Sequence, residues 1–260
     1  MNEPNPQPPV IPPGTLNLGD SAYAPLGSNP NEQIPITGIL TAFEAILRQP
    51  RRVLFHLTQA NAKNVIGALL MIFVIASVIY GFVAGTFSGH DQLWAAPAKV
   101  VLGLFISAAI CLPSLYIFAC LNGSQARLYE VAGLVAGLLA LTTILLIGFA
   151  PVAWIFSQST DSVVAMGVLH LSFWFIATCF GLRFLDSGFR HFSGSFGVGI
   201  KIWTVIFLLV VLQMTTALRP IIGRAPTFLP TEKKFFLSHW SDTVSDSNKA
   251  AGKKSDQDYR

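Results

Sequence analysis

The residues of this chain with the clearest capacity for chemistry are polar side chains inside long apolar runs. His170 is the only histidine within such a run, and Gln213 lies in the last run beside Thr215 and Thr216. Polar groups in hydrocarbon are costly and often mark proton or ion pathways. No Asp or Glu lies within the runs, so a proton relay lacks its usual carboxylate. We therefore interpret His170 and Gln213 as interhelical hydrogen-bonding residues, with a proton-carrying His170 as the alternative.

Sequence patterns typical of enzymes and metal sites are missing. The chain has no Gly-x-Ser-x-Gly, His-Glu-x-x-His, Walker or Cys-x-x-Cys sequence. Cys111, Cys120 and Cys179 all lie in apolar runs, which favours small buried hydrophobic residues over a disulfide or zinc site. His90 and Asp91 are adjacent but lack a third ligand. We expect no catalytic, cofactor-binding or metal-binding residues and no enzyme activity.

Two prolines lie within apolar runs that are long enough to form helices. Pro113 and Pro151 each remove one backbone hydrogen bond, which bends a helix. Bent helices frame substrate pathways in some transporters, but those folds are built from inverted repeats, and this chain shows none. We therefore expect Pro113 and Pro151 to mark helix kinks that serve packing.

The composition indicates that the elements that hold these residues lie in lipid. Hydrophobic residues make up 52% of the 260 residues, charged residues only 12%, and the mean hydropathy is +0.57. Soluble domains carry about 25% charged residues, so this chain has too little charge to cover a soluble surface. The net charge of +4 suits an anionic membrane surface better than nucleic acid, because no dense basic patch with interleaved aromatic residues occurs.

Five long apolar runs occupy the centre of the chain. About 20 helical residues cover the roughly 30 Å of a bilayer's hydrocarbon, and the last run is near this minimum and needs Lys201 to reach the headgroups. Backbone groups in lipid must be satisfied within the segment, which favours helices. The sequence therefore predicts an all-α, polytopic membrane helix bundle of five transmembrane helices within residues 63–218. The predicted spans are 65–87, 100–121, 131–156, 163–184 and 200–218.

The N-terminal region divides into two parts. Residues 1–35 are rich in proline and small polar residues, which predicts a disordered tail. Residues 36–62 carry apolar residues at helical spacing, which predicts an amphipathic helical segment in the membrane interface. Arg48, Arg51, Arg52 and Lys63 would then contact anionic headgroups. The same pattern fits an amphipathic helix packed on its own protein equally well.

The distribution of Lys and Arg predicts the orientation in the membrane. Eight of these residues lie in the N-terminal region and in the 122–130 and 185–199 loops with their flanks, which share one side of a five-span protein. The flanks and loops on the other side carry only Lys99 before residue 219, followed by Arg219, Arg224, Lys233 and Lys234 after the last span. Positive loops face the cytoplasm, so we expect a cytoplasmic N-terminus and an outside C-terminus. Residues 219–260 form an exposed C-terminal tail whose aromatic and basic residues suit the headgroup layer.

This layout, with the segment Phe43-Glu-Ala-Ile-Leu-Arg-Gln-Pro50, resembles the Yip family, the Ypt/Rab-interacting five-span membrane proteins and their bacterial relatives. The resemblance covers about residues 36–218. It implies a non-catalytic membrane scaffold that organises lipid or an unidentified membrane or cytoplasmic protein partner. No eukaryotic sorting signal is visible, which favours a bacterial inner membrane as the location.

The alternative function is a small transporter or permease subunit that uses the two proline kinks together with His170 and Gln213. A water-filled cavity between the spans that reaches either polar residue would favour it. Pairs of small residues four apart permit close helix contacts, either within one chain or in a homo-oligomer. These pairs are Gly81 with Gly85 and Gly133 with Gly137.

Overall fold

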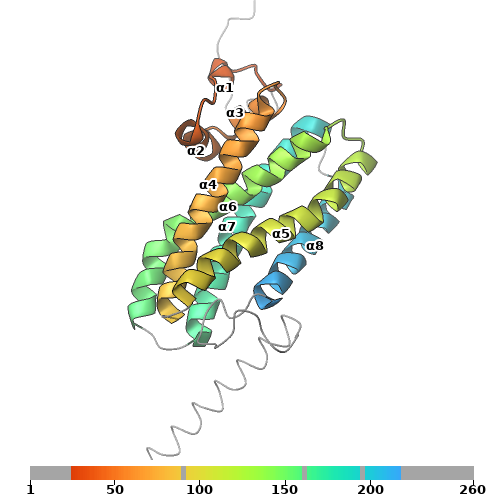
Figure 1. Cartoon of the computed structure of the whole chain (residues 1–260). Coiled ribbons are helices and arrows are strands. Elements are labelled where there is room, and N and C mark those ends of the chain that lie inside the picture. Colours follow the sequence, from red (N-terminus) through yellow and green to blue (C-terminus); the bar gives the residue numbers. More distant parts are fainter. Residues whose placement is uncertain (1–24, 89–91, 160–162, 194–196, 218–260) are drawn as a thin grey trace, which may run out of the picture.

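A computed structural model describes residues 25–88, 92–159, 163–193 and 197–217, and every regular element in these ranges is an α-helix (Figure 1). The predicted all-α class is confirmed for this part of the chain. Residues 1–24 of the predicted tail and the predicted C-terminal tail lie outside the described residues. The helices are α1 (Pro30–Gln33), α2 (Ile39–Arg48), α3 (Pro50–Leu57), α4 (Ala62–Ser88), α5 (Gln92–Leu121), α6 (Leu128–Ser159), α7 (Val163–Ser193) and α8 (Val198–Ala217).

Four of these helices are long and apolar enough, by length and composition, to cross a membrane. Their apolar parts are Ala62–Thr86, Leu93–Leu121, Leu128–Ser159 and Val164–Phe192. Each exceeds the roughly 20 residues that a bilayer requires, and the chain is accordingly treated as an integral membrane protein. α8 contributes a shorter apolar stretch, Val198–Met214, so the predicted fifth span rests on this helix.

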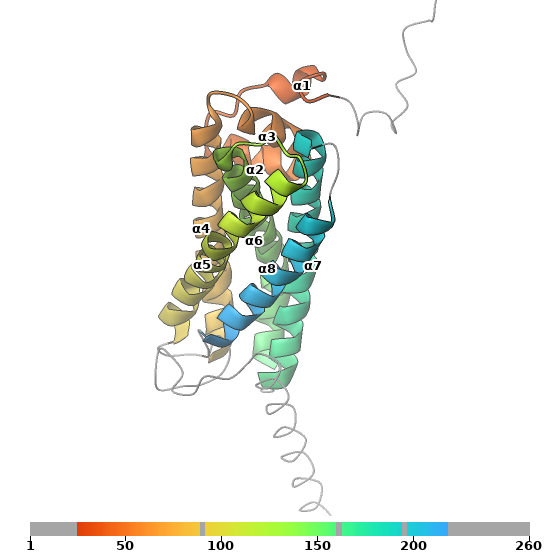
Figure 2. The same ribbon diagram turned by 90° about the vertical axis from the view of Figure 1, so that its right-hand side faces the viewer.

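α6 is the central helix of the bundle (Figures 1 and 2). It packs against α4 and α7, while α5 packs against α4 and α8 against α5. In its most apolar stretch 72% of the residues are buried, against 28% for α5 and α7. The outer helices therefore leave much of their apolar surface to face lipid, as expected when the solvent is hydrocarbon.

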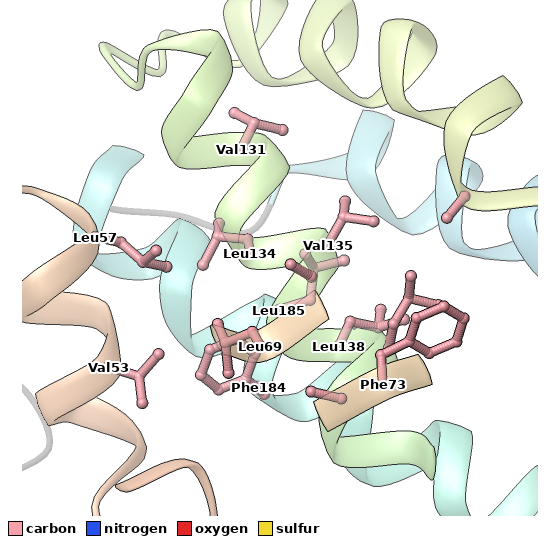
Figure 3. Packing of buried hydrophobic residues seen from close by; sticks show 14 of the residues in the cluster. Val53, Leu57, Leu69, Phe73, Val131, Leu134, Val135, Leu138, Phe184 and Leu185 are labelled. Carbon is pink, nitrogen blue, oxygen red and sulfur yellow. The ribbon is translucent and has the colours of Figure 1, made fainter. Parts of the chain in front are cut away.

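One apolar core joins the short helix α3 to the long helices (Figure 3). Leu57 of α3 lies against Gly133 of α6, where an added Cβ would sit 2.5 Å from the leucine Cδ2. Leu54 of α3 reaches Gly188 of α7 in a similar way, at 3.2 Å. The two glycines thus leave room for α3 to pack across one end of the bundle. Other members of this core include Leu69, Phe73, Leu134, Leu138, Phe184 and Leu185.

Glycines from both predicted small-residue pairs bring helices of this chain together. A Cβ at Gly81 would overlap the Cα of Pro97, so α4 and α5 approach closely at this point. A Cβ at Gly137 would overlap the ring of Phe184, so α6 and α7 are equally close there. At these two positions the small residues serve packing within one chain.

The N-terminal region differs from its predicted form within the last part of the predicted tail. Residues 25–35 belong to the predicted disordered tail, but they include α1, which packs against α3. Residues 36–62, the predicted amphipathic helical segment, form two separate helices and the start of α4. The break falls at Pro50, which begins α3, because its fixed φ suits a first helical position and its missing N–H is not needed there.

Candidate functional site

α1, α2 and α3, with the residues before α1, form a folded cap (residues 25–57) at one end of the bundle. The turn between α5 and α6 lies at the same end (Figures 1 and 2). Three of the four basic residues that the sequence assigns to headgroup contact lie in this cap. Their surroundings therefore decide which of them can reach lipid.

Arg51 is held by an ion pair inside the cap. Its Nε donates to Glu32 Oε1 at 2.6 Å, and the Glu32 side chain is 8% exposed. The other carboxylate oxygen accepts the Gly27 N–H at 2.6 Å. Gly27 has φ +86°, which favours glycine, and the Phe55 ring lies where a Cβ would point. These contacts fasten residues 27–32 onto α3.

Arg52 is buried, and carbonyls of the protein hold its guanidinium. Its Nε donates to the Ile34 carbonyl at 2.9 Å and its Nη2 to the Pro35 carbonyl at 3.0 Å, and the residue is 7% exposed. His56 Nε2 bonds the same Ile34 carbonyl at 2.8 Å. The structure differs here from the predicted lipid contact, because carbonyls of the preceding extended segment supply the partners that headgroups would have supplied.

Arg48 and Lys63 remain on the surface. Arg48 is exposed at the end of α2 and pairs with Glu44 one turn earlier, with 3.2 Å between Nη1 and Oε1. Lys63 is exposed in the first turn of α4. Their contact with anionic lipid stays a prediction, and it no longer depends on Arg51 or Arg52.

α2 has three distinct faces. A small buried face packs toward α4 and α6 and consists of Ala42, Ala45 and Ile46. Around the axis of α2, where successive residues are 100° apart, the large apolar side chains occupy an arc of about 100° next to the buried face. These residues are 40–84% exposed and comprise Ile39, Leu40, Phe43 and Leu47. The narrow remaining face carries Thr41, Glu44 and Arg48. The bulky apolar face is thus left open beside the bundle.

His170 forms the interhelical hydrogen bond that the sequence suggested. Its Nδ1 lies 2.6 Å from the Tyr80 hydroxyl of α4, and the two rings meet edge to face with centroids 5.6 Å apart. His170 is 7% and Tyr80 6% exposed. Sequence reasoning missed Tyr80, because an aromatic residue in an apolar run carries no signal for a partner 90 positions away.

Gln213 belongs to a different part of the bundle. It is half-buried on α8, which packs against α5, whereas His170 joins α7 to α4. The two polar residues that the sequence grouped as one candidate pathway therefore lie on different helix pairs.

The two predicted kink residues have different surroundings. Pro113 lies inside α5, and in the turn before it the Cys111 carbonyl accepts bonds from Trp203 Nε1 at 2.9 Å and Ser114 Oγ at 2.8 Å. Trp203 is fully buried, so this turn is where α8 docks on α5. Pro151 lies inside α6 with its side chain exposed. The degree of bending at both prolines stays a prediction.

The cysteines partly follow the expectation of burial. Cys111 is buried and Cys179 half-buried, but Cys120 is exposed. The difference arises because α5 is a peripheral helix, so an apolar run there supplies both a buried and a lipid-facing side. Among the described residues, no three His, Cys, Asp or Glu side chains gather in a group that could hold a metal ion.

Comparison with known proteins adds no relative. None of the protein-family models, curated proteins or solved structures compared with the chain matches it. A functional argument for this chain therefore rests on the geometry of the cap and of the bundle interior.

Proposed function

We propose that this protein is a non-catalytic membrane scaffold, similar to the Yip proteins, that organises lipid or a protein partner. The observation that carries the proposal is the open apolar face of α2, on which Leu40 is 84% exposed. A face of four large apolar side chains is unfavourable in water, and it lies at the end of a bundle whose long helices suit a bilayer. Lipid tails at the edge of one leaflet would cover it.

The polar edge of α2 supports this placement. Glu44 and Arg48 lie on the side opposite the buried and open apolar faces, so a helix sunk to the headgroup boundary would keep both charges in water. Arg48 and Lys63 would then meet anionic headgroups, each contributing about 1 kcal/mol near the surface. A partner protein bound at the same end would contact the cap and the leaflet together.

Spin labels on α2 test the proposal directly. The full-length chain, with its three cysteines replaced by alanine, would carry one label at Leu40→Cys or, as the matched control, at Glu44→Cys. In liposomes with anionic lipid we expect the label at position 40 to collide with oxygen more than with a nickel chelate, and the label at position 44 to show the reverse. Nickel access at both positions would contradict the insertion of α2.

We further propose that α8 is a fifth span, with the N-terminus in the cytoplasm, the C-terminus outside and the protein in a bacterial inner membrane. Its 20 residues are enough to cross about 30 Å of hydrocarbon. Lys99, which precedes the second predicted span on the side opposite the cap, is fully buried in α5, so it adds no exposed positive charge on that side. Reporters fused before Met1 and after Ser245 should report opposite sides, and the same side for both would exclude five spans.

The alternative, a small transporter or permease subunit, needs His170 to exchange protons. Its Nδ1 is engaged with Tyr80, which supports a structural role instead. Proton-coupled uptake into vesicles, measured with the folded variant His170→Gln, separates the two functions. A variant that stays folded but loses an uptake activity present in the wild type would overturn the scaffold proposal.

A further inference from the structure

The cap contains a surface pocket of about 230 Å³, which we call the cap pocket. One side of it comes from Asn29, Asn31 and Glu32 at the start of α1, and the other from residues 48–52, where α2 ends and α3 begins. The four residues of the open apolar face of α2 lie outside it. A water molecule takes about 30 Å³ of the liquid, so the pocket has room for a polar group several times larger.

The charged residues around the cap pocket are mainly basic. Arg48, Arg51 and Arg52 line it together with a single carboxylate, that of Glu32, which gives the lining a net charge of +2. α3 begins in the wall of the pocket, at Pro50, and the N-terminal end of a helix carries a partial positive charge. The electrostatics of the cap pocket therefore favour an anion.

Most side-chain acceptors in the pocket wall are already used within the protein. Both carboxylate oxygens of Glu32 accept the hydrogen bonds described above. Asn29 Oδ1 accepts the Asn31 N–H at 3.0 Å, and Gln49 Oε1 accepts Arg52 Nη1 at 3.3 Å. A ligand that needs acceptors would find few in this wall.

Hydrogen-bond donors in the wall remain available. Because the amide oxygens of Asn29 and Gln49 are engaged, their NH2 groups are the unused ends, and neither has a partner within the described residues. The Asn31 side chain makes no hydrogen bond in this part of the chain and can turn its NH2 group to a ligand. Arg48 uses only Nη1, for Glu44, and keeps Nε and Nη2. A phosphate group, with its negative charge and several acceptor oxygens, matches these four donors.

We propose that the cap pocket binds one phosphate group through Arg48, Gln49, Asn29 and Asn31. The same chemistry is offered by the phosphate of an anionic lipid headgroup and by free phosphate. The scaffold function enters only through the source of the phosphate, because a cap at the headgroup layer meets lipid phosphates first. Binding in detergent does not require α2 to enter lipid, and the spin-label test of α2 does not require the pocket, so either proposal can fail without the other.

Calorimetric titration of the full chain in a nonionic detergent tests the cap pocket with two probes. Sodium phosphate supplies the free ion, and phosphatidic acid in the same detergent supplies the group on a lipid. We expect saturable binding of one equivalent of at least one probe. Binding of phosphatidic acid alone would assign the pocket to lipid, and binding of sodium phosphate would assign it to a phosphate that needs no acyl chain. Binding of neither probe would overturn the proposal.

Two substitutions oppose phosphate binding while they keep the internal contacts of the cap. Gln49→Glu retains an oxygen for Arg52 but replaces the NH2 group by a second carboxylate oxygen. Asn31→Asp changes a side chain that has no hydrogen bond within the described residues, and its backbone N–H still bonds to Asn29. Each should weaken binding about tenfold or more, because a donor is lost and a negative charge faces the phosphate.

Gln59→Glu is the matched control, because it adds the same charge at an exposed position outside the pocket. It should bind each probe within about twofold of the wild type, since salt screens exposed charges. Unchanged protease resistance of residues 25–38 shows that the cap of each variant is folded. Undiminished binding by Gln49→Glu and Asn31→Asp, or an equal loss in Gln59→Glu, would overturn the proposal, because the probes would then respond to the general charge of the protein.

Discussion

α2 and α3 are consecutive helices that are both amphipathic and both carry arginine, yet they turn opposite surfaces outward. Leu40 of α2 is 84% exposed, whereas Leu54 and Leu57 of α3 are completely buried. Arg48 at the end of α2 is exposed, whereas Arg52 in α3 is 7% exposed. Amphipathic spacing alone therefore does not decide whether a helix faces lipid or protein.

The difference depends on which partners each helix meets. Arg52 of α3 finds the carbonyls of Ile34 and Pro35, which the chain presents in extended form just before α2. The leucines of α3 find glycines on α6 and α7 that leave them room. On the outer side of α2 the large residues meet no such recess, and only Ala42, Ala45 and Ile46 of its inner face are buried against the protein. Whether a helix with charged residues is buried thus depends on other parts of the chain, which must supply backbone carbonyls for its charges and small residues that leave room for its apolar side chains.

The largest effect that tests this comparison is expected from the leucines. Leu57→Ala removes a fully buried side chain from the core and should cost about 3 kcal/mol of unfolding free energy, since the lost contacts leave a cavity. Leu40→Ala should cost almost nothing in detergent, where the side chain already faces solvent or micelle. Unfolding of the purified full chain in a denaturing detergent measures both. Equal costs would mean that α2 is as deeply packed as α3.

The next largest effect concerns the buried arginine. Arg52→Ala would leave the Pro35 carbonyl without its donor and the Ile34 carbonyl with His56 alone, and it should cost about 2 kcal/mol, the usual range for a charged hydrogen bond. Protease cleavage between residues 25 and 38 should accelerate, because the segment is released from α3. Arg52→Lys should recover only part of the loss, since an ammonium lacks the fork that spans two carbonyls. A fully stable, protease-resistant Arg52→Ala protein would contradict the role of the carbonyls.

The long helices were predictable from the sequence, and the contacts that build the cap were not. The length of the apolar runs alone locates α4, α6 and α7, because in lipid each segment must form the hydrogen bonds of its own backbone N–H and C=O groups. α5 starts before the predicted residue 100, at Gln92, because Lys99 and Pro97 are tolerated where α5 packs against α4. The cap depends on contacts such as Arg51 with Glu32, 19 residues apart, and no helical period encodes them.

The partners of the candidate residues were likewise not predictable from the sequence. His170 stood out because a histidine is rare in an apolar run, but its partner Tyr80 did not. In the sequence Thr142 and Thr178 are indistinguishable from Thr143, although the Thr143 hydroxyl bonds the Leu139 carbonyl and the other two hydroxyls have no partner in the described part of the chain. Polar residues are found from sequence, and their partners come from the tertiary structure.

A smaller effect is expected where a buried polar side chain has one partner. His170→Leu removes the bond to Tyr80 and should cost on the order of 1 kcal/mol. His170→Gln keeps a donor and an acceptor and should leave assembly nearly intact. In a Tyr80→Phe background the leucine substitution should add little, because the bond is already absent. Thermal unfolding in mild detergent measures the wild type and the four variants, and fully additive costs would show that the hydrogen bond does not couple the two side chains.

The smallest effect is expected at Arg48, and it tests whether α2 has a fixed polar edge at all. Both side chains of the Arg48–Glu44 pair are exposed, so Arg48→Ala should change the free energy of unfolding by only about 0.3 kcal/mol. Raising the salt concentration should reduce even this difference, since exposed charges are screened within about 10 Å at 0.1 M.

Lys63→Ala is the matched control, because Lys63 is an exposed basic residue of the neighbouring helix. In detergent both variants should stay close to the wild type, while in anionic bilayers each should weaken the contact of its own helix with the headgroups. If Arg48→Ala instead cost as much as Arg52→Ala in detergent, α2 would be anchored through its charge as α3 is, and the open apolar face would not distinguish the two helices.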